Sequence, residues 1–306
     1  MKLYYYKDTK LFHCYTECSD SFDIFELFKR FYQARGISYN FYNDIYYVIL
    51  NDVKIDIDDF DAFTYEAQAE KYQRKKKEII LTEYPEGLLN LFVHQYPAEW
   101  IEEGITPATM DKYNIRYSIS QNKIIIPHYD VHNRLVGIRG RALNPEEAEK
   151  GKYKPIWIEG KMYNHPLSLN LYGLNYTKPA IDRSKRVIIF ESEKSVLLMD
   201  SYFGEENNSV AICGSSFNKN QLKLLLKYTK AVEFIIALDK EYSKIGTKKS
   251  ESYFNKIREI CQKYNKYGSF YYLADKEGLL REKDSPIDRG PDIFLRLLEK
   301  KIPVGE

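Results

Sequence analysis

The strongest constraint on the fold is an alternation of apolar strands and helices in the C-terminal half of the chain. The short apolar runs 185–192 (KRVIIFES), 209–214 (SVAICG) and 231–239 (AVEFIIALD) predict buried strands. The segments between them, 195–203 and 218–230, have the apolar spacing of helices. Because parallel strands need a crossover connection, usually a helix, this order predicts an α/β fold with a parallel sheet covered by helices.

Carboxylates follow two of these strands at the point where each strand ends. Glu191 comes directly after VIIF and Asp239 directly after FIIAL, with Glu241 two residues farther on. The carboxyl ends of parallel strands lie at one edge of a sheet, so we expect the three side chains to converge there. Clustered carboxylates repel one another unless a divalent cation neutralises them, and oxygen ligands suit Mg²⁺. Either acid alone is more often a solvated turn residue or a helix cap, but two in register favour a metal site.

A further acidic segment precedes the predicted C-terminal helix. LREKDSPIDRGPDIF (280–294) contains Asp284, Asp288 and Asp292. By itself such a segment is typical of a helix-capping loop. It would join the predicted metal site only if the fold brings it to the same edge of the sheet.

Basic residues alternate along a predicted strand farther upstream. The segment 123–143 (KIIIPHYDVHNRLVGIRGRAL) predicts two strands joined by a polar turn, and Arg139 and Arg141 alternate on the second. Lys152 and Lys154 follow with the same spacing of two. Each of these residues alone fits a charged strand edge exposed to solvent.

Two further parts of the N-terminal region have recognisable patterns. Residues 2–13 (KLYYYKDTKLFH) predict two short strands around a polar turn, followed by a helix, which makes a small hairpin–helix unit. Residues 98–116 predict two short helices, the second capped by Thr106 with Pro107 at its first position.

The near-balance of charge conceals an uneven distribution. The chain has 46 Lys and Arg residues against 44 Asp and Glu, a net charge of +2. Residues 1–110 hold 12 basic and 19 acidic side chains, a net charge of −7, which leaves +9 for residues 111–306. The basic character therefore lies in the same part of the chain as the predicted strands and acids.

Composition also indicates the cellular compartment in which the protein is expected. The mean hydropathy is −0.52, and no apolar run approaches the roughly 18 residues that a membrane span needs, so no membrane partner is expected. Four scattered cysteines are too few for a disulfide framework in a chain of 306 residues. We therefore expect a cytoplasmic protein, in the host cytoplasm if it is phage-encoded.

The chain resembles the Toprim domain of bacterial-type (DnaG-like) DNA primases, in the form common in phage-like versions. The resemblance rests on four segments in the family's order: RVIIFESEKSVLLMD, NKNQLKLLLKYT, EFIIALDKE and EKDSPID. Upstream, GITPATMDKYNIRY, the basic strands and LNLYGL resemble the segments that precede Toprim in that family. The resemblance therefore covers residues from about 98 to 295.

The resemblance assigns roles to the residues that match the family's motifs. It implies that Glu191, Asp239 and Glu241 are catalytic and that, together with Asp284, they bind Mg²⁺ or Mn²⁺. Glu241 departs from the family, which has Asp at this position. The family's basic segments hold the template and the incoming nucleotide, which implies that role for Arg139, Arg141, Lys152 and Lys154. Lys194, at the start of the predicted helix after Glu191, is a weaker candidate for nucleotide binding, with contact either to a phosphate or to Glu191 itself. A basic position that the family carries just before LYGL is replaced here by Leu167 or Leu169.

The resemblance also predicts a division of the chain. We expect a partial zinc-ribbon-like unit at 1–52, an acidic helical linker at 53–97, a mixed α+β basic subdomain at 98–184 and the Toprim catalytic domain at 185–306. LFHCYTECSDSFDIFELFKRF resembles the second half of the primase zinc ribbon. Cys14 and Cys18 form only a remnant half-site, because a structural zinc needs four ligands, so no zinc is expected.

These features predict a DNA primase that synthesises short RNA primers from ribonucleoside triphosphates on a single-stranded DNA template during DNA replication. The resemblance also implies a replicative helicase as a partner, through a surface that it does not identify. Two alternatives stay open. A Toprim nuclease could use the same carboxylates to cleave DNA. A non-catalytic Toprim module would only bind single-stranded DNA or a replication partner, an alternative that Glu241 and the missing basic position support.

Overall fold

The structure is a computed structural model in which the chain divides into two compact units, residues 1–80 and 81–306. It describes residues 3–7, 9, 11–15, 20–36, 38, 81–149 and 151–304. Cys18 and residues 53–80 of the predicted linker lie outside the described residues. Residues 81–97, where the sequence predicts the end of the linker, belong to the second unit.

The first unit contains the predicted hairpin and helix. Its described antiparallel strands pair in the order β1–β2–β3 and are followed by helix α1. The elements described in this unit are β1 (Leu3–Tyr6), β2 (Leu11–Cys14), β3 (Ser21–Phe22) and α1 (Ile24–Ala34). Asp23 is the N-cap residue of α1, and its side chain accepts a hydrogen bond from the Glu26 amide at 2.9 Å. Cys14 is buried at the end of β2.

The second unit begins with short helices and an antiparallel sheet of order β4–β5–β6–β7–β8. The strands are β4 (Arg116–Ser118), β5 (Lys123–Tyr129), β6 (Leu135–Ala142), β7 (Tyr153–Ile158) and β8 (Lys161–Tyr163). The helices of this part are η3 (Glu86–Leu91), α4 (Ala98–Glu102), α5 (Pro107–Lys112) and α6 (Pro145–Glu149). Every residue of β6 is buried, although this strand carries two arginines. The predicted basic strand is therefore central in its sheet rather than an exposed edge.

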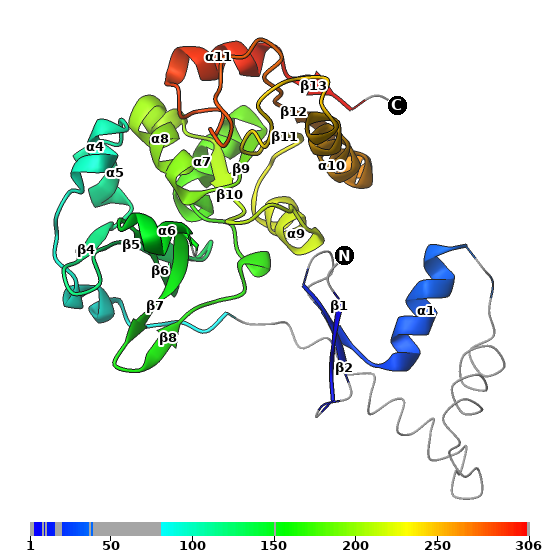
Figure 1. Ribbon diagram of the computed structural model, residues 1–306, viewed down its shortest axis with the longest axis horizontal. Helices are drawn as coiled ribbons and strands as arrows, with labels where there is room; N and C mark the ends of the chain where they lie inside the picture. The colour runs from blue at the N-terminus through cyan, green and yellow to red at the C-terminus, as the bar shows by residue number, and fades with distance from the viewer. Residues whose placement is uncertain are drawn as a thin grey trace, which may run out of the picture. The chain divides into compact units, whose positions relative to one another are not determined.

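A five-stranded sheet of order β10–β9–β11–β12–β13 forms the rest of the second unit, and all of its pairs except β12–β13 are parallel (Figure 1). Its strands are β9 (Arg186–Phe190), β10 (Ser209–Ala211), β11 (Glu233–Ala237), β12 (Ser269–Tyr272) and β13 (Ile302–Pro303). The accompanying helices are η4 (Leu167–Leu169), α7 (Leu174–Ser184), α8 (Glu193–Phe203), η5 (Gly204–Glu206), α9 (Lys219–Tyr228), α10 (Lys248–Tyr264), η6 (Asn265–Tyr267) and α11 (Pro291–Glu299). The predicted α/β fold is confirmed.

The two faces of the parallel sheet are buried in separate hydrophobic clusters. Ile188 and Phe190 of β9 pack in the cluster that contains the apolar side chains of α8 and α11. Val187 and Ile189 pack in the other cluster, against α7, α9 and α10. This alternation follows from the period of two along a strand, and burial on both faces explains why the strand sequences are almost wholly apolar.

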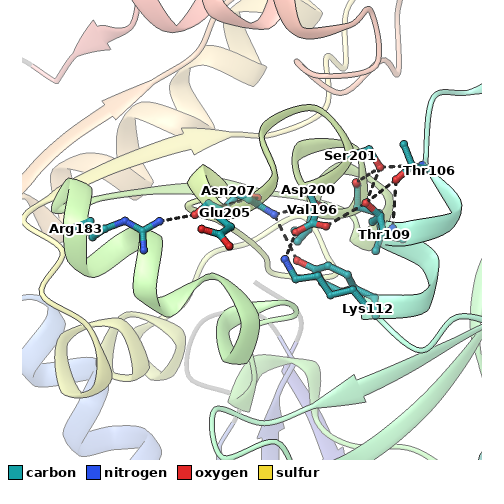
Figure 2. A network of polar contacts seen from close by, with 12 residues as sticks. Thr106, Thr109, Lys112, Arg183, Val196, Asp200, Ser201, Glu205 and Asn207 are labelled. Atoms are coloured by element: carbon teal, nitrogen blue, oxygen red, sulfur yellow. Dashed lines mark hydrogen bonds and ion pairs between the residues drawn. The ribbon is translucent and has the colours of Figure 1, made fainter.

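A polar network fixes α5 on α8 (Figure 2). Asp200 of α8 is only 7% exposed and accepts hydrogen bonds from Thr109 Oγ1 at 3.0 Å and Lys112 Nζ at 2.5 Å. Thr106 caps α5, as the sequence predicts, and its amide donates to Ser201 Oγ at 3.0 Å. The helices that precede the antiparallel sheet are thereby joined to the helix that follows β9.

None of the helices in the described part of the chain has both the length and the hydrophobicity needed to cross a membrane.

Candidate active site at the edge of the parallel sheet

Glu191 and Asp239 lie at the carboxyl ends of two neighbouring strands. β9 and β11 pair in parallel with Phe190 opposite Ala237, so the residues that follow them are close together. Burial raises the pKa of Glu191, the charge of Lys256 opposes this effect, and the carboxylate of Glu241 adds to it. The shared edge that the sequence predicts is therefore present, and its acids influence one another.

Asp239 is the most perturbed acid of this edge. Burial, followed by the charges of Glu191 and Asp288, raises the pKa of Asp239 to about 8. Its Oδ1 atom is buried and has no hydrogen-bond partner among the described residues. A buried carboxylate oxygen without a donor is unfavourable unless a cation or water satisfies it. The chemistry of this group therefore fits a divalent cation, which would remove both the repulsion and the missing contact.

The other two predicted acids, Glu241 and Asp284, both pair with basic side chains. Glu241 is exposed, and its Oε1 lies 3.2 Å from Nζ of Lys256 on α10. Asp284 Oδ2 accepts a hydrogen bond from Arg289 Nε at 2.7 Å and from the Arg281 amide at 2.8 Å. The loop before α11 does approach the site, because the Asp284 carbonyl oxygen accepts from the Lys240 amide at 2.9 Å.

Asp288 is the acid of that loop whose charge acts on Asp239. Its Oδ1 lies 2.9 Å from Lys194 Nζ. Lys194 Nζ also lies 2.8 Å from Glu103 Oε2, at the end of α4. Burial alone would lower the pKa of Lys194, but the carboxylates of Asp288 and Glu103 outweigh it and raise this pKa. Sequence reasoning noted Asp288 without giving it a role, because only the folded loop shows which acid faces the sheet edge.

Arg141, Lys152 and Lys194 form a group of cations that we call the basic corner. Arg141 is buried in it, and only some of its donor atoms have hydrogen-bond partners among the described residues. The residue is 6% exposed, and its side chain donates from Nη2 to Glu103 Oε1 at 3.2 Å. Its Nε and Nη1 atoms are buried and have no hydrogen-bond partner in the described part of the chain. The pKa of Lys152 is lowered by desolvation and by the charges of Arg141 and Lys194, so the three cations are near one another. Lys154 on β7 is exposed and pairs in register with Gly140, so its side chain lies on the face of the sheet opposite to Arg139 and Arg141.

Arg139 is oriented differently, although it is only two residues from Arg141 on the same strand. It is 8% exposed and donates from Nη1 to Glu193 Oε1 at 2.5 Å and from Nη2 to the Tyr153 carbonyl oxygen at 3.2 Å. The guanidinium is therefore engaged inside the protein. Arg139 could reach nucleic acid, as the sequence pattern indicates, only by leaving Glu193.

Glu193 also lies in a group of side chains that no sequence pattern predicts. His128, Glu193 and Cys213 bring metal-ligand atoms within 4.8 Å of one another, and no other three His, Cys, Asp or Glu residues of the described chain do so. The predicted acids of the sheet edge therefore lie too far apart to form such a group. Burial alone would raise the pKa of Glu193, but Arg139 and His128 outweigh it and lower this pKa to about 2. The three residues come from distant segments without fixed spacing, so no sequence motif could have identified them.

Comparison with known proteins identifies one relative that covers almost the whole chain and others that cover part of it. No protein-family model matches it. The SPbeta prophage-derived uncharacterized protein YorJ of Bacillus subtilis (strain 168) is 39% identical over an alignment 332 positions long, gaps included, which covers 99% of this chain and 85% of YorJ. The DNA primase of Synechococcus elongatus is 23% identical over 170 residues, which cover 55% of this chain and 23% of that primase.

Comparison with solved structures shows the fold. The Aquifex aeolicus primase, with its zinc binding and RNA polymerase domains, matches with a TM-score of 0.53 and 15% identity, over 98% of this chain and 75% of that one. A DnaG primase catalytic domain bound to ssDNA matches with a TM-score of 0.50 and 17% identity, over 71% of this chain and 77% of that one. The chain thus belongs to the same family as the prophage protein YorJ, and it has the fold of the bacterial DnaG primase core.

Proposed function

We propose that the chain is a DNA primase, which joins ribonucleotides into short RNA primers on a single-stranded DNA template during DNA replication. The observation that carries this proposal is Asp239. Its buried Oδ1 atom has no hydrogen-bond partner among the described residues, and the carboxylate lies beside Glu191 at the carboxyl edge of the parallel sheet in a DnaG-like fold. Relatives that are DNA primases support the same assignment.

Asp239 and Glu191 would hold a divalent cation, Mg²⁺ or Mn²⁺, with Glu241 and Asp284 as further acids of the site. Such a cation, when bound, neutralises the charge that develops on the phosphorus oxygens during nucleotidyl transfer. Mg²⁺ keeps several of its waters, so a site with few protein carboxylates suits it. Nucleotidyl transfer of this kind needs no side-chain nucleophile.

The basic corner beside the acids would bind phosphates of the template or of the incoming ribonucleoside triphosphate. Arg141 presents two buried nitrogen atoms without a partner in the described residues, and buried donors of this kind favour an anionic ligand. Lys152 and Lys194 add positive charge around it, whereas Lys154 would contact phosphates only from the other face of the sheet. One of the similar structures is a primase domain bound to ssDNA, which supports a single-stranded template here. A replicative helicase stays a proposed partner without an assigned surface.

Template-dependent incorporation of labelled ribonucleotides with Mg²⁺ or Mn²⁺ tests the proposal. We expect the wild-type chain to make short RNA products on single-stranded DNA. Asp239→Ala should reduce the rate by about 100-fold or more, because it removes the acid most suited to the cation. Asp182→Asn is the matched control, since Asp182 pairs with Lys178 on α7 away from the site and should keep the wild-type rate.

Three results would contradict the proposal. Equal rates for wild type and Asp239→Ala would show that the site does not carry the activity. Cleavage of DNA without added nucleotides, and without incorporation when they are present, would favour a nuclease. DNA binding without any product would favour a non-catalytic module.

A further inference from the structure

The first residue of α8 connects the two sheets of the second unit. Glu193 begins this helix and is 1% exposed. Its Oε1 atom accepts a hydrogen bond from Arg139 Nη1 on β6 at 2.5 Å, and the same atom lies 3.1 Å from Nε2 of His128 on β5. His128 is also 1% exposed, so the contact is closed to solvent. The start of α8 is thus joined to two central strands of the antiparallel sheet.

The next two side chains tie the same helical turn to other segments. Lys194 Nζ contacts Glu103 after α4 and Asp288 before α11. Ser195 Oγ donates to Ser285 Oγ at 2.8 Å, and both serines are buried. Three consecutive side chains therefore hold this turn from three directions.

This turn determines where Glu191 lies. Glu191 follows β9, Ser192 is the N-cap residue of α8, and Glu193 is the first helical residue. A fixed Glu193 therefore fixes the backbone that carries Glu191. Partners that orient a metal ligand commonly act in this way without touching the metal themselves.

The charge of Arg139 explains why we interpret the group around Glu193 as an ion-pair network. His128, Glu193 and Cys213 offer atoms of the kind that bind metal ions. The guanidinium, however, already contacts the Glu193 carboxylate, and a metal ion beside it would place a second cation in the protein interior. Buried charges are costly unless they are paired, so one buried carboxylate fits one buried guanidinium.

We propose that Glu193 is a positioning residue for the cation site: together with Arg139 and His128 it holds the start of α8 so that Glu191 can bind the divalent cation with Asp239. This inference rests on the proposed function, because it concerns the same cation. It gives Arg139 a role different from contact with nucleic acid.

Titration of the full chain with Mn²⁺ tests the proposal, with electron paramagnetic resonance measuring the free ion. Glu193→Gln keeps the size of the side chain but removes its charge. We expect it to weaken Mn²⁺ binding by about tenfold or more, the range typical of lost outer contacts of metal ligands. Asp200→Asn is the matched control, because Asp200 is a buried, ion-paired carboxylate on the same helix, two turns away from the site. It should lower the thermal midpoint but leave Mn²⁺ affinity within about twofold.

A second variant keeps the test decisive if Glu193→Gln does not fold. Replacing both Arg139 and Glu193 by Met removes both charges and fills similar volume, a change that proteins often tolerate. The paired variant should show the same loss of Mn²⁺ affinity. Wild-type affinity in either folded variant would overturn the proposal, as would a wild-type chain that binds no Mn²⁺. Stoichiometric zinc that is lost in Cys213→Ser would also overturn it, because the group would then be a metal site.

The titration is independent of RNA synthesis. If Mn²⁺ affinity falls as stated but the wild-type chain makes no primer, the proposed function fails while the positioning role holds. If primers are made and Glu193→Gln binds Mn²⁺ with wild-type affinity, the proposed function holds while the positioning role of Glu193 fails.

Discussion

Two arginines on one strand show how strongly surroundings decide the role of a residue. Arg139 and Arg141 lie two residues apart on β6, and both are almost fully buried. Arg139 is paired with a fully buried carboxylate, whereas Arg141 keeps two nitrogens without a partner in the described chain. The sequence supports equal roles for both, because the residue that distinguishes them, Glu193, is more than fifty positions away. Only the fold shows which of the two arginines is available for a ligand.

The raised pKa of Asp239 makes stability depend on pH. The folded pKa is about 8, against an ordinary value of 3.8, so between these values the unfolded chain loses a proton that the folded chain keeps. The free energy of unfolding therefore falls as pH rises from about 4 to about 8. We expect Asp239→Asn, which cannot ionise, to be more stable than wild type at pH 8.5, by about 1–3 kcal/mol after allowance for partial solvent contact.

Thermal unfolding in the presence of a chelator at pH 5 and pH 8.5 measures this difference. In the presence of the chelator, the gain in stability of Asp239→Asn over wild type should be present at pH 8.5 and small at pH 5. When Mn²⁺ replaces the chelator, this gain should shrink, because the ion stabilises the wild type. Asp182→Asn, whose acid has a lowered pKa, should show no such gain at high pH. An equal effect of Asp239→Asn at both pH values would contradict the assignment.

At the scale of elements, the loop after β11 is anchored by a lysine that points inward. Lys240 lies between Asp239 and Glu241, and its Nζ donates to Asp275 Oδ2 and to the Leu280 carbonyl oxygen, both at 2.8 Å. The side chains of Lys240 and Asp275 are 6% and 0% exposed. The two acids are therefore presented by a loop whose middle residue is buried, which limits how far the acids can move.

Removing this anchor should destabilise the second unit strongly. Lys240→Met leaves Asp275 buried without its cation, so we expect a loss of about 3–5 kcal/mol in the free energy of unfolding. Urea denaturation measures this loss. Lys249→Met is the control, because Lys249 pairs with Glu282 at the surface, and its loss should cost less than about 1 kcal/mol. Similar losses of unfolding free energy in both variants would show that the buried pair stabilises the protein no more than the surface pair does.

Elements with local patterns could be predicted from the sequence, whereas contacts between distant elements could not. The apolar runs of β9, β10 and β11 and the cap at Thr106 depend on neighbouring residues, and the structure confirms them. The edge shared by Glu191 and Asp239 followed from the rule that parallel strands end together. The approach of Asp288 to Asp239 depends on how a loop folds across the sheet, and no local pattern contains that information.

At the scale of the whole molecule, the second unit has a core of its own. The three hydrophobic clusters found among the described residues all consist of residues after position 81. We expect residues 81–306, expressed alone, to unfold cooperatively, with a midpoint within about 2 °C of the same transition in the full chain. Both tryptophans, Trp100 and Trp157, lie in this unit, so tryptophan fluorescence reports its unfolding in either protein.

A gradual transition, or a much lower midpoint for residues 81–306, would show that the first unit contributes to the core. Circular dichroism at the same temperatures provides a second probe, and its transition should coincide with that of the fluorescence.

The complete burial of β6 has a consequence for how relatives of this protein can diverge. Glu193 and Arg139 neutralise each other in the interior, so replacing only one of them would leave the other as an unpaired buried charge. Positions 139 and 193 should therefore change together among homologues, as a coupled pair, and an isolated change at either position should mark a lineage in which the cation site has been remodelled or lost.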